Sequence, residues 1–115
     1  MMWVILAGLL LGILIGFHLP VQIPQSVARY LAVSVLAGLD TAFGGLRATL
    51  EGDFDTAIFV SGFLANTVLA ALLTYAGDLL GLELYLAAVF AFGVRIFTNL
   101  AMIRRHLVKR LTKNR

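Results

Sequence analysis

Cysteine is absent from the 115 residues, and charged residues are scarce at 13%. The lack of cysteine excludes disulfides, thiolate metal sites and cysteine nucleophiles. The only two histidines, His18 and His106, lie far apart, so one chain offers too few donors for a zinc or haem site. We therefore expect no cofactor and no bound metal. The low charge also departs from the roughly 25% that is usual in soluble domains.

Hydrophobic residues, by contrast, make up 61% of the chain, and the mean hydropathy is +0.97. Four long apolar stretches occupy nearly all of the length and leave no room for a separate water-soluble module. About 20 apolar residues in a helix cross a hydrocarbon core roughly 30 Å thick. The composition predicts an all-α protein: a polytopic transmembrane bundle of four spanning segments over residues 1–103, then a basic cytoplasmic tail over residues 104–115.

Three of the four stretches are simple to interpret. Residues 1–17 have no ionisable side chain, and we expect this span to stay attached because its start lacks the basic residue of a signal peptide. The prolines in residues 18–28 predict an exposed connection. Residues 56–77 carry no charge and residues 84–103 carry only Arg95, so both are predicted to span.

The second stretch, residues 27–50, is interrupted by Asp40, by the pair Gly44-Gly45 and by Arg47. We prefer a full span. The glycine pair could instead break or kink the helix and produce a re-entrant or partly interfacial element. Arg47 is expected to reach towards the membrane surface or to contact Glu51, four residues further on.

Basic residues are concentrated at the C-terminus, where six of the nine Lys and Arg lie between Arg104 and Arg115. Positive charge beside a span favours the cytoplasmic side, so the C-terminus is predicted to be cytoplasmic. With four spans the N-terminus is cytoplasmic as well. The acidic segment 51–55 then faces inward, and the turn at Asp78 faces outward.

Gly8, Gly12 and Gly16 recur every four residues and so fall near one face of the first span. Such a face lets another helix approach closely. One interpretation is self-association into a homo-oligomer, and the other is packing against a helix of the same chain.

Polar residues lie at the same depth in three spans, because Asp40, Asn66 and Arg95 are each near the middle of a segment. A lone charge at the bilayer centre costs about 2.5–3.5 kcal/mol, so such groups normally find partners. We predict an Asp40–Arg95 ion pair, with a hydrogen bond from Asn66 and with Asn99 on the same face as Arg95. This network would fix helix register, act as a proton or ion relay, or pair subunits.

The C-terminal tail continues helical spacing and is predicted to lie on the membrane surface. Its basic residues would each gain roughly 1 kcal/mol from anionic lipid headgroups. Docking of an acidic cytoplasmic partner is the alternative, and nucleic acid is not an expected partner. The contacting residues are Arg104, Arg105, Lys109, Arg110, Lys113 and Arg115.

Three motifs follow one another along the chain. They are Leu39-Asp40-Thr41-Ala42-Phe43-Gly44-Gly45-Leu46-Arg47-Ala48, Phe59-Val60-Ser61-Gly62-Phe63 and the block from Leu84 to Phe97, closed by Arg104-Arg105. Their order resembles the bacterial small basic protein family, and the similarity covers essentially the whole chain. The resemblance implies a plasma-membrane protein of Gram-positive-type bacteria, often encoded beside cell-division genes, with no assigned activity, cofactor or catalytic residue.

These observations together predict a non-enzymatic integral membrane protein. The sequence offers no nucleophile with a base, no paired carboxylates at working distance and no metal-ligand spacing. We expect an oligomerising scaffold or recruitment component with partners in cell division or envelope assembly. The alternative is a small transporter or channel that uses Asp40 and Arg95.

Overall fold

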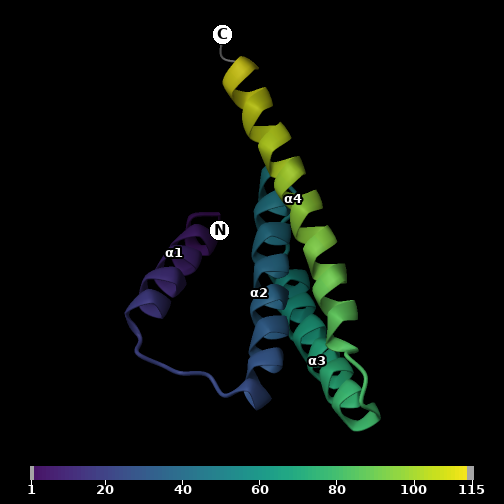
Figure 1. The fold of residues 1–115 in the computed structure, drawn as a ribbon. Helices are drawn as coiled ribbons and strands as arrows, with labels where there is room; N and C mark the ends of the chain where they lie inside the picture. The colour runs from purple at the N-terminus through teal and green to yellow at the C-terminus, as the bar shows by residue number, and fades with distance from the viewer. Residues whose placement is uncertain (1, 114–115) are drawn as a thin grey trace.

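The computed structural model describes residues 2–113 and contains four α-helices (Figure 1). They are α1 (Met2–His18), α2 (Gln25–Glu51), α3 (Thr56–Leu80) and α4 (Tyr85–Lys113). The regular structure in the described residues is helical throughout, which confirms the predicted all-α class. Helices α2, α3 and α4 pack together, and α1 leans against one side of them (Figure 1).

Three of the helices are long and apolar enough to cross a membrane, namely α2, α3 and α4 with 27, 25 and 29 residues. Helix α1 has 17 residues. At about 1.5 Å per residue it is roughly 25 Å long, which is shorter than a hydrocarbon core of roughly 30 Å. The described chain therefore has three candidate spans, and the length of α1 alone does not make a fourth.

Helix α2 runs without interruption through Gly44 and Gly45, so the alternative of a broken or re-entrant second segment is wrong. The glycines serve close packing. A Cβ on Gly45 would lie 2.6 Å from Cε2 of Phe59, a residue of α3. Helix α2 ends instead at Glu51, where the capping residue Gly52 adopts the left-handed conformation (φ 78°) that glycine tolerates best.

Two apolar clusters hold the helices together. The first lies between α2, α3 and α4 and consists of Val33, Ala37, Ala70, Ala88 and Phe92. The second joins α1 to α2 through Ile5, Ala42 and Leu46, with Phe54 and Phe59 packed against them. Small residues such as Ala37 and Ala70 allow the backbones to approach closely. Asp40 lies between the two clusters along α2.

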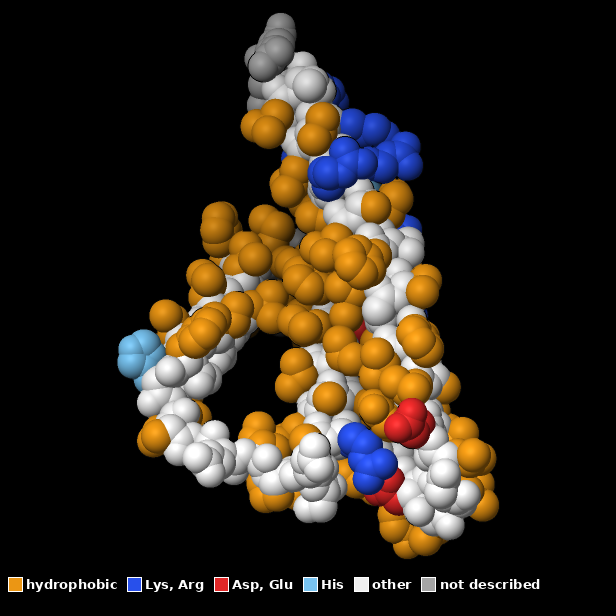
Figure 2. Space-filling view, viewed as in Figure 1, with side chains coloured by type: hydrophobic (Ala, Val, Ile, Leu, Met, Phe, Trp, Pro, Cys, Tyr) orange, Lys and Arg blue, Asp and Glu red, His pale blue; other side chains and the backbone are white. Residues whose placement is uncertain are grey.

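Only the first half of α1 packs against the rest of the chain. Ile5 is its one buried residue, while Leu10, Leu14 and Phe17 are exposed. The second half and the connection to α2 stand away from the bundle, and an open space separates them from α2 (Figure 2). Nothing lies within 4 Å of a Cβ placed on any of the three predicted packing glycines, Gly8, Gly12 and Gly16. Packing of this face within the chain is therefore not observed.

Helix α4 continues without a break from the predicted span into the basic tail. Its 29 residues give a length of roughly 43 Å, which exceeds the hydrocarbon core. The last turns project beyond α2 and α3, and Lys and Arg side chains gather there (Figures 1 and 2). No turn separates the predicted tail from α4, so the described tail residues continue the same helix, and their place at the membrane surface stays a prediction.

Candidate functional site

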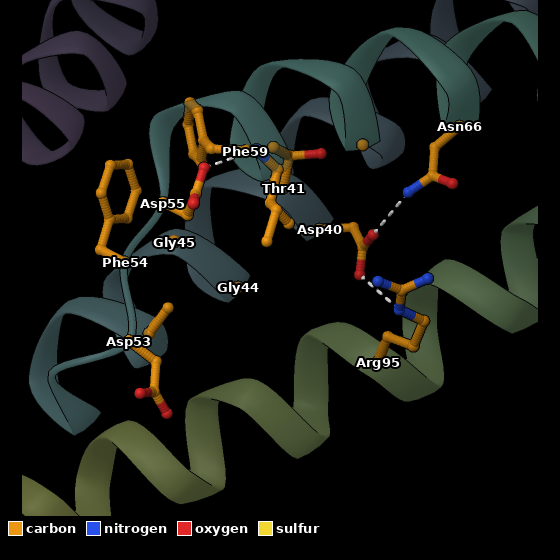
Figure 3. Close-up of a pocket in the computed structure, with 13 residues that line it drawn as sticks. Asp40, Thr41, Gly44, Gly45, Asp53, Phe54, Asp55, Phe59, Asn66 and Arg95 are labelled. Atoms are coloured by element: carbon orange, nitrogen blue, oxygen red, sulfur yellow. Dashed lines mark hydrogen bonds and ion pairs between the residues drawn. The ribbon is translucent and has the colours of Figure 1, made fainter.

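Asp40 is the centre of a polar cluster deep in the bundle (Figure 3). Arg95 Nε of α4 lies 3.1 Å from Asp40 Oδ1, and Asn66 Nδ2 of α3 donates a hydrogen bond to Asp40 Oδ2 at 3.4 Å. These are the contacts that the depth of the three residues predicts. Each of the three bundled helices thus contributes one member to the cluster.

The two charges of this pair differ sharply in exposure. The Asp40 side chain is 0% exposed, whereas the Arg95 side chain is 59% exposed. Asp40 Oδ1 accepts no hydrogen bond from any described residue, so its contact with Arg95 is a charge interaction without hydrogen-bond geometry. Burial of the carboxylate makes the guanidinium its essential counter-charge.

Asn99 does not join the Asp40 cluster, contrary to the prediction. Its Oδ1 accepts a hydrogen bond of 3.3 Å from Arg47 Nη1. Arg47 also donates through Nε to Glu51 at 2.7 Å, as the four-residue spacing predicts. The reason is register: Asn99 lies one turn beyond Arg95 and faces Gly44, whose Cβ would be 3.6 Å from the Asn99 amide.

Two further contacts extend this second cluster to the end of α2. His106 Nε2 lies 3.5 Å from Glu51 Oε1, and Arg110 Nη2 donates to the carbonyl of Leu50 at 3.5 Å. Arg110 is thus close to the free carbonyls at the end of α2, where a positive charge is favourable. Arg110 was predicted to contact lipid or a partner and here also contacts α2, and His106 carried no predicted contact.

A third polar cluster lies at the opposite end of the bundle. Arg29 Nη2 lies 2.8 Å from Asp78 Oδ1, and the Tyr30 hydroxyl donates to Asp78 Oδ2 at 3.1 Å. The Arg29 guanidinium is also 5.9 Å from the centre of the Tyr85 ring. This cluster was missed because Arg29 and Asp78 sit at predicted helix ends, where charges need no partner.

The three polar clusters share one sequence offset between α2 and α4. Contacts between α2 and α4 join Arg29 to Tyr85, Asp40 to Arg95 and Glu51 to His106, so the partners are 55 or 56 residues apart each time. The α2 members recur every eleven residues, which is three turns of helix. Helices α2 and α4 therefore run parallel in one fixed register (Figure 1). This spacing is the sequence signal that would have located the missed residues.

A cavity of about 190 Å³ adjoins the central cluster. Its inner end holds Asp40, Asn66 and Arg95, and its outer end holds Asp53 and Asp55 of the α2–α3 loop (Figure 3). Glycine and alanine line the wall between the two ends, at Gly44, Gly45, Ala48 and Gly62. Within residues 2–113, no group of three His, Asp or Glu is placed to hold a metal ion.

The remaining tail residues predicted to contact lipid are exposed on the projecting part of α4 and belong to none of the three polar clusters. These are Arg104, Arg105, Lys109 and Lys113. Arg115, the last member of the predicted set, lies outside the described residues.

The fold defines a class: an all-helical protein whose three long apolar helices are suited to a membrane and whose interior charges are paired. The chain belongs to the family described as "Protein of unknown function (DUF1290)", which matches residues 23–108. This finding and the relatives below confirm the resemblance seen in the motifs.

Two relatives are similar over almost their whole length. The "Small basic protein" of Bacillus subtilis (strain 168) is 50% identical over 111 residues, which cover 96% of this chain and 92% of the relative. An uncharacterized protein of Mycobacterium tuberculosis (strain ATCC 25618 / H37Rv) is 43% identical over 104 residues, which cover 89% and 86%. No solved structure matches the chain.

Proposed function

We propose that the protein is a four-pass, non-enzymatic component of the bacterial plasma membrane. Ile5 of α1 packs with Ala42 and Leu46, whereas α2 begins at Gln25. Residues 5–25 therefore run antiparallel to α2 over the length between Gln25 and the Ile5 contacts. This length is roughly 25–31 Å, close to the thickness of the hydrocarbon core. In this proposal α1 makes the fourth crossing through a locally thinned bilayer, and the extended connection lies at the membrane interface. The basic tail favours a cytoplasmic position for both termini.

Its role is that of an oligomerising scaffold. The observation that carries this proposal is the uncovered glycine face of α1, beside the open space between α1 and α2 (Figure 2). Helices in lipid associate through close packing at small residues. The paired polar clusters support the same role, since they hold helix register while leaving the outer faces of the bundle apolar.

A single cysteine at Gly12 tests the scaffold proposal, because the chain has no cysteine of its own. Gly12→Cys in native membranes is expected to give an oxidative dimer, whereas Leu14→Cys, on the opposite and exposed face of α1, is not. The measurement is non-reducing electrophoresis. Equal crosslinking of the two variants, or none at Gly12, would contradict the proposal.

Partners in division or envelope assembly follow from the resemblance to the small basic protein family and from the projecting basic end of α4. The exposed Lys and Arg there suit anionic lipid headgroups and an acidic partner surface. Photo-crosslinkers placed at Arg105 and Lys109 in living cells, followed by mass spectrometry, would identify what is bound. Recovery of lipid alone would remove the recruitment role.

The rival function is a small transporter or channel, and the observation that favours it is the cavity that ends at Asp40 and Arg95. We expect purified protein in liposomes to pass no ion or small solute, because the paired charges close the inner end of the cavity. Flux measured with ion-sensitive dyes would check this. A flux that Asp40→Asn abolishes would replace the scaffold proposal.

A further inference from the structure

We propose that the cavity between α2, α3 and α4 is a water-filled vestibule that opens at the α2–α3 loop and reaches the Asp40–Arg95 pair inside the membrane. We call the end of the bundle that holds this loop and the projecting part of α4 the tail end. The inference concerns hydration and access, and it holds whether or not the protein forms oligomers.

The lining follows one face of each of two helices. On α2, Asp40, Gly44 and Ala48 recur at four-residue steps, and on α3, Gly62 and Asn66 do the same. Because residues four apart share a helix face, the small side chains leave a continuous groove between the helices. From Asp40 to the end of α2 the groove covers roughly 16 Å, about half of the hydrocarbon core.

The inner end is polar enough to hold water. A cavity of about 190 Å³ has room for several water molecules, each of which occupies roughly 30 Å³ in the liquid. The Arg95 side chain is 59% exposed, whereas the Asp40 side chain beside it has no exposed surface. A guanidinium at mid-membrane depth with no surrounding water would face hydrocarbon, which is costly. Water in the cavity solvates the Arg95 guanidinium, while the buried Asp40 carboxylate keeps its contacts with Arg95 and Asn66.

The charges of the lining set the solutes that enter. Asp53 and Asp55 stand at the mouth, and Asp40 and Arg95 neutralise each other at the inner end. A cleft lined by one sign of charge raises the local concentration of the opposite ion. Small cations should therefore enter more readily than small anions.

Cysteine accessibility tests the vestibule in the naturally cysteine-free chain. The test compares Gly62→Cys with Leu64→Cys. Gly62 lines the cavity, and a Cβ there would meet no atom within 4 Å, whereas Leu64, two residues further on, lies on the other face of α3 and is 56% exposed. Thiosulfonates react with thiolates, which form only where water reaches. A cationic, membrane-impermeant thiosulfonate is applied to sealed vesicles of each orientation.

We expect Gly62→Cys to react at least about tenfold faster than Leu64→Cys, only from the side of the tail end, because only its thiol meets water. Adding Ala48→Leu should slow the reaction by narrowing the path, and an anionic thiosulfonate should react more slowly than the cationic reagent. Equal protection of both cysteines, or labelling from the opposite side, would overturn the vestibule. Equal rates for both reagents would overturn the preference for cations.

Discussion

Replacing Arg95 with methionine is expected to destabilise the folded protein by about 3–5 kcal/mol, the usual cost of leaving one member of a buried ion pair without its partner. The Asp40 side chain is wholly buried, so neither solvent nor another described cation can replace the guanidinium. The reverse change, Asp40→Asn, should cost less. It leaves behind an arginine whose side chain is 59% exposed.

Unfolding in detergent micelles, followed by circular dichroism against denaturant, measures these losses. The double variant Asp40→Asn/Arg95→Met should recover most of the loss, because the amide can still bind Asn66 and no charge stays buried. Asp78→Asn is the matched control: its pair with Arg29 is partly exposed and should contribute about 1 kcal/mol or less. Additive losses in the double variant would show that Asp40 and Arg95 are not coupled.

Among glycine-to-alanine substitutions, Gly77→Ala is expected to destabilise the folded protein most. A Cβ there would lie 2.5 Å from the carbonyl oxygen of Leu82 and 3.0 Å from the backbone nitrogen of Leu84. The same turn depends on the 2.9 Å hydrogen bond from the Leu82 N–H to the Gly77 carbonyl. Because backbone atoms must move, we expect a loss of about 1–3 kcal/mol or more, seen as a lower melting temperature in detergent.

Gly93→Ala is the control for Gly77→Ala, with the opposite expected sign. Gly93 lies inside α4, and nothing is within 4 Å of its added Cβ. Alanine in a helix interior is favoured over glycine by about 0.5–1 kcal/mol, partly through the unfolded state. A gain at Gly93 with a loss at Gly77 would support the tight α3–α4 turn, and equal effects at both sites would contradict it.

The central cluster around Asp40 was predictable because a charged side chain inside the lipid bilayer normally needs a polar or charged partner. Asp40, Asn66 and Arg95 lie at one depth in three apolar runs, and unpaired charges at that depth are costly. The same argument could not place Asn99 or His106. Their partners depend on how α2 is shifted along α4, and hydropathy does not determine that shift until one contact is known.

The arrangement of α1 was harder to predict for a different reason. Its residues are apolar on every side, so no face is marked for burial, and Leu10, Leu14 and Phe17 are exposed while Ile5 is buried. Likewise, Gly44 and Gly45 suggested a break in α2, yet Gly45 faces the Phe59 ring. Glycine permits both a kink and a close contact, and only the neighbouring helix decides between them.

The constant offset between α2 and α4 limits how this protein can move. Sliding one helix past the other by a single turn, about 5.4 Å, would separate Arg29 from Tyr85, Asp40 from Arg95 and Glu51 from His106 in the same step. Piston-like motion between these two helices is thereby penalised at three heights at once. Helices α2 and α4 would move as one rigid body. Any conformational change transmitted across the membrane by this chain would have to involve movement of α1 or α3.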